Sequence, residues 1–122
     1  MSKITIIGSG RVGSTIAYSL TCRGLGSEIV IIDINGDRAL GEAQDIRQGL
    51  SYDSSCIVYA GNYDDAKNSD IVVITSGIAR KPGQSRLDLI KTNIDIQKSI
   101  IPEITKAAPN AVYIMVSNPV DI

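Results

Sequence analysis

Short apolar runs alternate along the chain with longer stretches in which apolar residues recur every three or four positions. The short runs lie at residues 3–7, 28–32, 56–59, 71–74 and 111–116. Their length and their content of isoleucine and valine are typical of buried strands. The longer stretches lie at residues 12–22, 37–50 and 87–107 and predict helices, with one further short helical turn at 64–68.

This order of elements, β-α-β-α-β-β-α-β, predicts an α/β fold: a doubly wound parallel sheet with right-handed crossovers. In the second helix, Ala39, Ala43, Ile46 and Leu50 lie on one face, which we expect to be buried. Pro102 lies inside the third helix and should kink or interrupt it, because proline lacks a backbone N–H group.

A glycine turn joins the first strand to the first helix. Gly8, Gly10 and Gly13 form the pattern G-x-G-x-x-G, and Asp33 ends the next strand. We expect Gly8 to permit a tight turn, Gly10 to leave room for a pyrophosphate, and Gly13 to allow close packing of helix on strand. The free N–H groups at the start of the helix would face the phosphates. A purely structural role of the glycines in a tight βα turn is the alternative.

Asp33 also bears on the choice of cofactor. A carboxylate at the end of the second strand accepts hydrogen bonds from ribose hydroxyls and repels a 2′-phosphate, which favours NAD over NADP. Arg38 is near enough in the sequence to weaken this inference, unless it is simply an exposed helix residue.

Composition excludes several classes of function. The chain has 122 residues and a net charge of −1, so we expect one domain, residues 1–122, without a basic surface for nucleic acid or an anionic membrane. It has no apolar run of the ~20 residues that span a bilayer and no signal peptide at its start. With no histidine and no closely spaced cysteines, we expect no metal site. Cys22 and Cys56 fit a reducing cytoplasm, and we expect both to be buried.

Four segments resemble the L-lactate/L-malate dehydrogenase family. They read Gly-Ser-Gly-Arg-Val-Gly-Ser-Thr at 8–15, Ile-Ile-Asp-Ile at 31–34, Thr-Ser-Gly-Ile-Ala-Arg-Lys-Pro-Gly-Gln-Ser-Arg-Leu-Asp-Leu at 75–89 and Val-Ser-Asn-Pro-Val-Asp at 116–121. The resemblance covers the whole chain and implies a Rossmann NAD-binding domain. All four segments belong to the ends of predicted strands or to the loops after them, where doubly wound sheets bind ligands.

The resemblance also implies roles for individual residues. The cofactor-binding set is Gly8, Gly10, Arg11, Val12 and Gly13 at the pyrophosphate, Asp33 and Ile34 at the adenosine ribose, and Thr75, Ser76, Gly77, Asn93, Val116 and Asn118 towards the nicotinamide. Arg86 resembles the loop arginine that closes over the substrate and polarises its 2-oxo group, and it is the catalytic residue that we expect in this chain. Asn118 would bind near the same oxygen. As alternatives, Arg86 only caps a helix and Asn118 only forms a turn.

Arg80 is at the position that reads the side chain of the substrate in this family. An arginine there offers a charge-assisted, bidentate pair to a second carboxylate, an interaction of about 1.5–3 kcal/mol, which favours malate and oxaloacetate. Gln84 matches neither subgroup, so lactate and pyruvate remain the alternative, and Arg80 as an ordinary loop charge is a third reading.

The second half of the family, which carries a His–Asp pair that delivers a proton to the substrate, has no counterpart here. We therefore expect the chain to bind NAD(H) without dehydrogenase turnover and to expose apolar surface on its last strand. The parent enzyme would be a homodimer or homotetramer acting on a small 2-oxo or 2-hydroxy acid, with the helix at 37–50 as a dimer face. A non-catalytic NAD(H)-sensing Rossmann module is the rival class of function.

Overall fold

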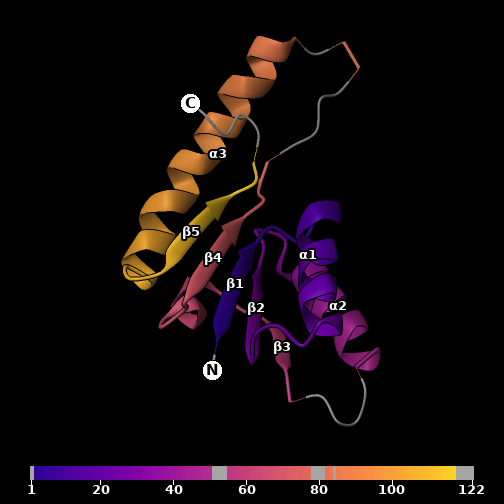
Figure 1. Cartoon of the computed structure of the whole chain (residues 1–122). Helices are drawn as coiled ribbons and strands as arrows, with labels where there is room; N and C mark the ends of the chain where they lie inside the picture. The colour runs from indigo at the N-terminus through magenta and orange to yellow at the C-terminus, as the bar shows by residue number, and fades with distance from the viewer. Residues whose placement is uncertain (1, 51–54, 78–81, 84, 118–122) are drawn as a thin grey trace.

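A computed structural model describes residues 2–50, 55–77, 82–83 and 85–117 of the chain. The elements follow the predicted order, and their bounds are β1 Lys3–Ile7, α1 Arg11–Cys22, β2 Glu28–Ile32, α2 Gly36–Gln48, β3 Ile57–Ala60, η1 Tyr63–Ala66 (a 3₁₀ turn), β4 Ile71–Ile74, α3 Arg86–Ala107 and β5 Val112–Met115. The predicted α/β fold with a parallel sheet is therefore confirmed (Figure 1).

The five strands form one sheet in the order β3-β2-β1-β4-β5. Every neighbouring pair is parallel, with Ile4 of β1 beside Ile29 of β2 on one side and Ile71 of β4 on the other. The chain leaves β1 towards β2 and β3 and later returns to β4 on the opposite side of β1. The strand order thus reverses between β1 and β4, and in open parallel sheets the carboxyl ends of the strands at such a reversal flank the crevice in which ligands bind.

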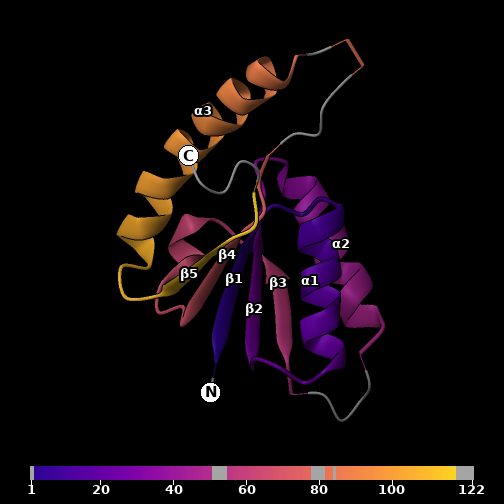
Figure 2. The same cartoon turned by 45° about the horizontal axis from the view of Figure 1, so that its top comes forward.

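Helices cover both faces of the sheet, as Figures 1 and 2 show: α1 and α2 pack over β1–β3, and α3 packs over β4 and β5. The core beneath α1 and α2 contains the buried residues Ile4, Ile6, Ala17, Ile29, Ile31, Ala39, Ala43, Ile46, Val58 and Val73. The core beneath α3 and η1 contains Ile7, Val30, Ile32, Ala66, Val72, Ile74, Ile100, Ile104 and Ala108. Since both faces of β1 and β2 are buried, β-branched residues fill these strands without alternation.

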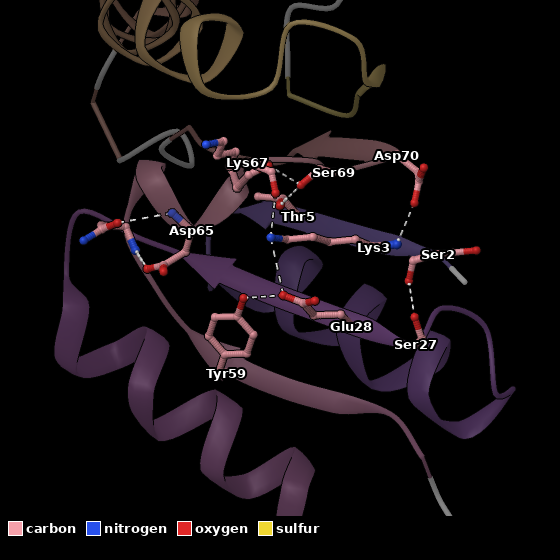
Figure 3. A network of polar contacts seen from close by, with 12 residues as sticks. Ser2, Lys3, Thr5, Ser27, Glu28, Tyr59, Asp65, Lys67, Ser69 and Asp70 are labelled. Atoms are coloured by element: carbon pink, nitrogen blue, oxygen red, sulfur yellow. Dashed lines mark hydrogen bonds and ion pairs between the residues drawn. The ribbon is translucent and has the colours of Figure 1, made fainter.

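A polar network holds the amino ends of the strands together (Figure 3). Lys3 Nζ lies 3.4 Å from Glu28 Oε2 and donates to the carbonyl of Lys67 at 2.7 Å. The hydroxyl of Tyr59 donates to the same Glu28 carboxylate. These side chains therefore join β1, β2, β3 and the segment before β4 at the amino edge of the sheet.

The structure corrects two sequence expectations: an interruption of the third helix at Pro102 and the burial of Cys22. The third helix runs through Pro102 without a break. Lys98 and Pro102 are both exposed, so water can bond the Lys98 carbonyl that the proline leaves without a helical partner. Cys22, which we expected to be buried, is exposed at the end of α1, and Cys56 is half-buried.

One face of β5 is uncovered. Val112 is 64% exposed and Ile114 is 46% exposed, whereas Tyr113 and Met115 turn the other way and pack on the core beneath α3. An apolar face on the last strand is thus present as expected. Among the described residues, no helix is long and apolar enough to cross a membrane.

Candidate dinucleotide-binding site

The glycine turn lies at the carboxyl end of β1 and is tied to both neighbouring strands. The N–H of Gly8 donates to the carbonyl of Ile32 in β2 at 2.7 Å. On the other side, the Thr75 hydroxyl, directly after β4, donates to the carbonyl of Ile7 at 3.0 Å. Hydrogen bonds to β2 on one side and from Thr75 on the other therefore hold the turn at the carboxyl end of β1.

Gly8 and Gly13 are required by the protein itself. Gly8 has a φ of +107°, and a Cβ on it would lie 2.5 Å from Thr75 Oγ1. A Cβ on Gly13 would lie 1.8 Å from the carbonyl oxygen of Gly8, because α1 crosses the turn at contact distance. These two contacts account for two of the three glycines of the motif without any ligand.

At position 10, no contact within the described part of the protein requires a glycine. Its φ is −70°, and the nearest atom to a Cβ placed on it is Arg38 Nη2 at 3.9 Å. Gly10 is also the N-cap of α1, and the described residues supply neither a side-chain cap nor an acidic residue in the first turn. Unsatisfied N–H groups and the positive end of the helix dipole thus face open space, which fits a pyrophosphate.

Asp33 lies beside this turn at the end of β2, where it is half-buried. Its Oδ2 accepts hydrogen bonds from the backbone N–H of Ser9 at 2.7 Å and from the Ser9 hydroxyl at 2.6 Å, and its Oδ1 accepts from the N–H of Asn35 at 2.9 Å. Burial raises the pKa of Asp33, but these hydrogen bonds and the charge of Arg38 outweigh burial and lower the pKa below its usual value. The group is therefore a carboxylate at neutral pH.

Two exposed apolar side chains flank Asp33 and the turn. Val12, in the first turn of α1, is 52% exposed, and Ile34, directly after Asp33, is fully exposed. Arg11 in α1 and Arg38 in α2 are exposed as well. An apolar ring system placed between α1 and α2 would therefore contact apolar side chains, with cations nearby.

A second polar cluster lies at the carboxyl ends of β4 and β5. The carbonyl of Ser76 accepts from Gln97 Nε2 at 2.9 Å and from Ser117 Oγ at 2.7 Å. Asn93, 4% exposed, faces the same segment: a Cβ on Gly77 would lie 3.4 Å from Asn93 Oδ1. The structure thus brings Thr75, Ser76, Gly77 and Asn93 together. Val116 joins them through its N–H, which donates to the carbonyl of Ile74 at 2.9 Å.

The substrate-binding candidates are only partly described. Arg86 is exposed at the first position of α3, and the side chain that caps this helix is that of Ser85, which accepts from the N–H of Asp88 at 3.1 Å. In Figures 1 and 2 the start of α3 projects beyond the carboxyl edge of the sheet. The predicted roles of Arg80 and Asn118 fall on residues outside the described part of the chain.

Sequence reasoning missed three residues of this edge. Ser9 is an unspecified position of the glycine motif, and Gln97 is one polar residue among several on α3. Ser117 was part of a motif but had no assigned role. None of the three had a signal in the sequence, because each contact joins segments that are far apart along the chain.

Comparison with known proteins identifies the family of the chain. The family model described as "lactate/malate dehydrogenase, NAD binding domain" matches residues 2–122. An L-lactate dehydrogenase of Clostridium perfringens is 54% identical over 121 residues, which is 99% of this chain and 38% of that protein.

Solved structures of both enzyme types share the fold. The minor L-lactate dehydrogenase of Enterococcus mundtii, in a ligands-bound form, has a TM-score of 0.93 at 38% identity and is matched over 98% of this chain and 38% of its own. The malate dehydrogenase of Archaeoglobus fulgidus in complex with NADH has a TM-score of 0.91 at 39% identity, over 96% of this chain and 40% of its own. The chain therefore spans about two fifths of the length of these relatives.

Proposed function

Because the chain belongs to the lactate/malate dehydrogenase family, as its NAD-binding domain, we propose that it is the cofactor-binding part of an NAD-dependent L-2-hydroxy acid dehydrogenase. One observation carries the proposal. Gly10 leaves open space at the uncapped start of α1, where no protein atom requires a glycine, and Asp33 lies next to that space.

Each part of the crevice then has a role. The N–H groups at the start of α1 bind the pyrophosphate, and Asp33 accepts from a hydroxyl of the adenosine ribose. Val12 and Ile34 offer apolar contacts beside them. The cluster around Ser76, Gly77 and Asn93 orients the nicotinamide half, where bound NAD would supply or accept the hydride.

For the substrate we propose pyruvate and L-lactate. The support is the 54% identity to an L-lactate dehydrogenase over nearly the whole chain. Solved lactate and malate dehydrogenases match this chain at similar identity, so they do not distinguish between the two substrate classes. Malate and oxaloacetate, which the argument from Arg80 favoured, thus have less support than lactate and pyruvate. Arg86 would polarise the 2-oxo group and Asn118 would bind near it, as the family resemblance implies.

The test is the ratio of kcat/KM for pyruvate to that for oxaloacetate, with NADH, in a full-length enzyme that carries these 122 residues as its NAD-binding domain. We expect at least a tenfold preference for pyruvate, with little change in Arg80→Gln. Lys81→Gln removes one positive charge from the same loop and is the matched control. A preference for oxaloacetate that collapses in Arg80→Gln and not in Lys81→Gln would overturn the proposal and establish a malate dehydrogenase.

A further inference from the structure

Ser9 is completely buried although it lies in a turn at the edge of the sheet, with 0% of its surface exposed. Both of its donors point to one atom: its backbone N–H and its hydroxyl donate to Asp33 Oδ2 at 2.7 and 2.6 Å. The side chain is therefore not filling space in the core; it joins the glycine turn of β1 to the acid at the end of β2.

The two bonds determine which oxygen of Asp33 is left for a ligand. A carboxylate oxygen has two lone pairs, and Ser9 occupies both on Oδ2. Oδ1 accepts one bond, from the N–H of Asn35 at 2.9 Å, so among the described residues one acceptor direction on Oδ1 stays free. A ribose hydroxyl can donate to that direction only while the carboxylate keeps this rotation.

We propose that Ser9 is a positioning residue for cofactor selection: its hydroxyl holds Asp33 so that Oδ1 faces the adenosine ribose, and this sets the preference for NAD over NADP. The inference rests on the proposed role of Asp33 in ribose binding. It concerns the side chain of Ser9, which the glycine motif leaves unspecified.

Arg38 explains why the hydroxyl matters in addition to the backbone bond. Its guanidinium lies beside the turn, 3.9 Å from the Cβ position of Gly10, and its charge contributes to the lowered pKa of Asp33. Without the Ser9 hydroxyl, Oδ2 keeps a single neutral donor, and the carboxylate is free to rotate towards Arg38. The ribose hydroxyl of NADH then loses its hydrogen-bond acceptor. The 2′-phosphate of NADPH makes no such bond, and for NADPH the rotation only reduces the repulsion by the carboxylate.

The first test compares dissociation constants for NADH and NADPH in the chain and in Ser9→Ala, with fluorescence as the readout. We expect Ser9→Ala to weaken NADH binding about tenfold, the effect of one hydrogen bond to a charged group. NADPH binding should change less than about threefold, so the preference for NADH narrows. Ser69→Ala is the matched control. It removes another buried hydroxyl, bonded to Thr5 and Ala66 away from the crevice.

The pH profile separates positioning from a general loss of structure. The Ser9 hydroxyl is one cause of the lowered pKa of Asp33, so this pKa is higher in Ser9→Ala. NADH binding needs the ionised carboxylate and is lost as the pH falls through that pKa. We expect the acid limb of NADH binding to move to higher pH in Ser9→Ala and to stay in place in Ser69→Ala.

Two further measurements distinguish a failure of the proposed role of Asp33 from a failure of the proposed role of Ser9. If Asp33→Asn leaves the NADH-to-NADPH preference unchanged, the proposed role of Asp33 is wrong. If Asp33→Asn abolishes the preference and Ser9→Ala keeps it, only the role of Ser9 is wrong. Should Ser9→Ala not fold, NMR of the unsubstituted chain decides: the Ser9 amide proton should stay protected from exchange when NADH binds, and loss of that protection overturns the proposal.

Discussion

Gln97 in the middle of α3 and Ser117 after β5 donate hydrogen bonds to the same carbonyl oxygen, that of Ser76, at 2.9 and 2.7 Å. These two residues are far apart in the sequence, and the shared acceptor lies at the carboxyl end of β4, in the region that we propose for the nicotinamide. The Oε1 atom of Gln97 is buried and has no partner among the described residues, so packing alone holds that side of the amide.

Two donors on one acceptor make the effects of their removal non-additive. We expect Gln97→Ala and Ser117→Ala each to weaken NADH binding about two- to threefold, because the remaining donor still holds the carbonyl. The double substitution should weaken binding by more than the product of the two. Thr105→Ala, which removes a hydroxyl from the exposed side of α3, is the control. Effects that simply multiply would contradict the shared role.

The glycines at 10 and 13 should respond in opposite ways to alanine. Gly13→Ala puts a methyl group 1.8 Å from the Gly8 carbonyl, which α1 can relieve only by moving off the sheet. We expect it to lower the free energy of unfolding by about 3 kcal/mol or more, measured by urea denaturation.

Gly10→Ala is the matched control, since its methyl group would meet no atom closer than 3.9 Å. We expect a stability change within about 1 kcal/mol but at least a tenfold loss of NADH affinity, because the methyl group enters the space of the pyrophosphate. If both variants are equally unstable, or if Gly10→Ala binds NADH normally, the assignment of this space to the cofactor is wrong.

Asp33 should make stability depend on acid pH. Burial raises its pKa, but the bonds from Ser9 and Asn35 and the charge of Arg38 bring it below the usual value of 3.8. A lowered pKa in the folded state stabilises the fold at pH values above the unfolded pKa, and this stability is lost as the pH falls through the folded pKa.

The melting temperature of Asp33→Asn should therefore lie below that of the chain by a constant amount from neutral pH down to about pH 5. The difference should shrink below about pH 4, as the carboxylate of the unsubstituted chain takes up a proton. Asp45→Asn, which removes an exposed carboxylate from α2, is the control. A difference that persists unchanged at low pH would show that the carboxylate charge is not what Ser9 and Asn35 stabilise.

The chain of 122 residues should bind NADH without turning over a substrate. Reduction of a 2-oxo acid needs a proton donor at the developing alkoxide, and the chain has no histidine. Absorbance of NADH should stay constant with pyruvate and with oxaloacetate, while NADH fluorescence reports binding. Steady oxidation of NADH by the pure chain would contradict this expectation and require another proton donor.

The sequence by itself determined the parts of the fold that depend on local patterning. Five apolar runs became five strands within a residue or two, and the buried residues Ala39, Ala43 and Ile46 lie on the predicted face of α2. The glycine motif with Asp33 located the turn and the acid at one edge, because the carboxyl ends of parallel strands meet there. These features follow from periodicity and backbone geometry, which are local properties.

The tertiary structure alone decided which distant groups meet. No spacing in the sequence predicts that Ser9 holds Asp33, or that Gln97 and Ser117 share the carbonyl of Ser76, because these contacts depend on how strands and helices are placed. Exposure behaves in the same way. Pro102 is tolerated because its side of α3 faces water, and Val12 is exposed because α1 presents its first turn to the crevice. The packing of whole helices and strands determines both the contacts between distant residues and the exposure of these side chains, and no local pattern encodes that packing.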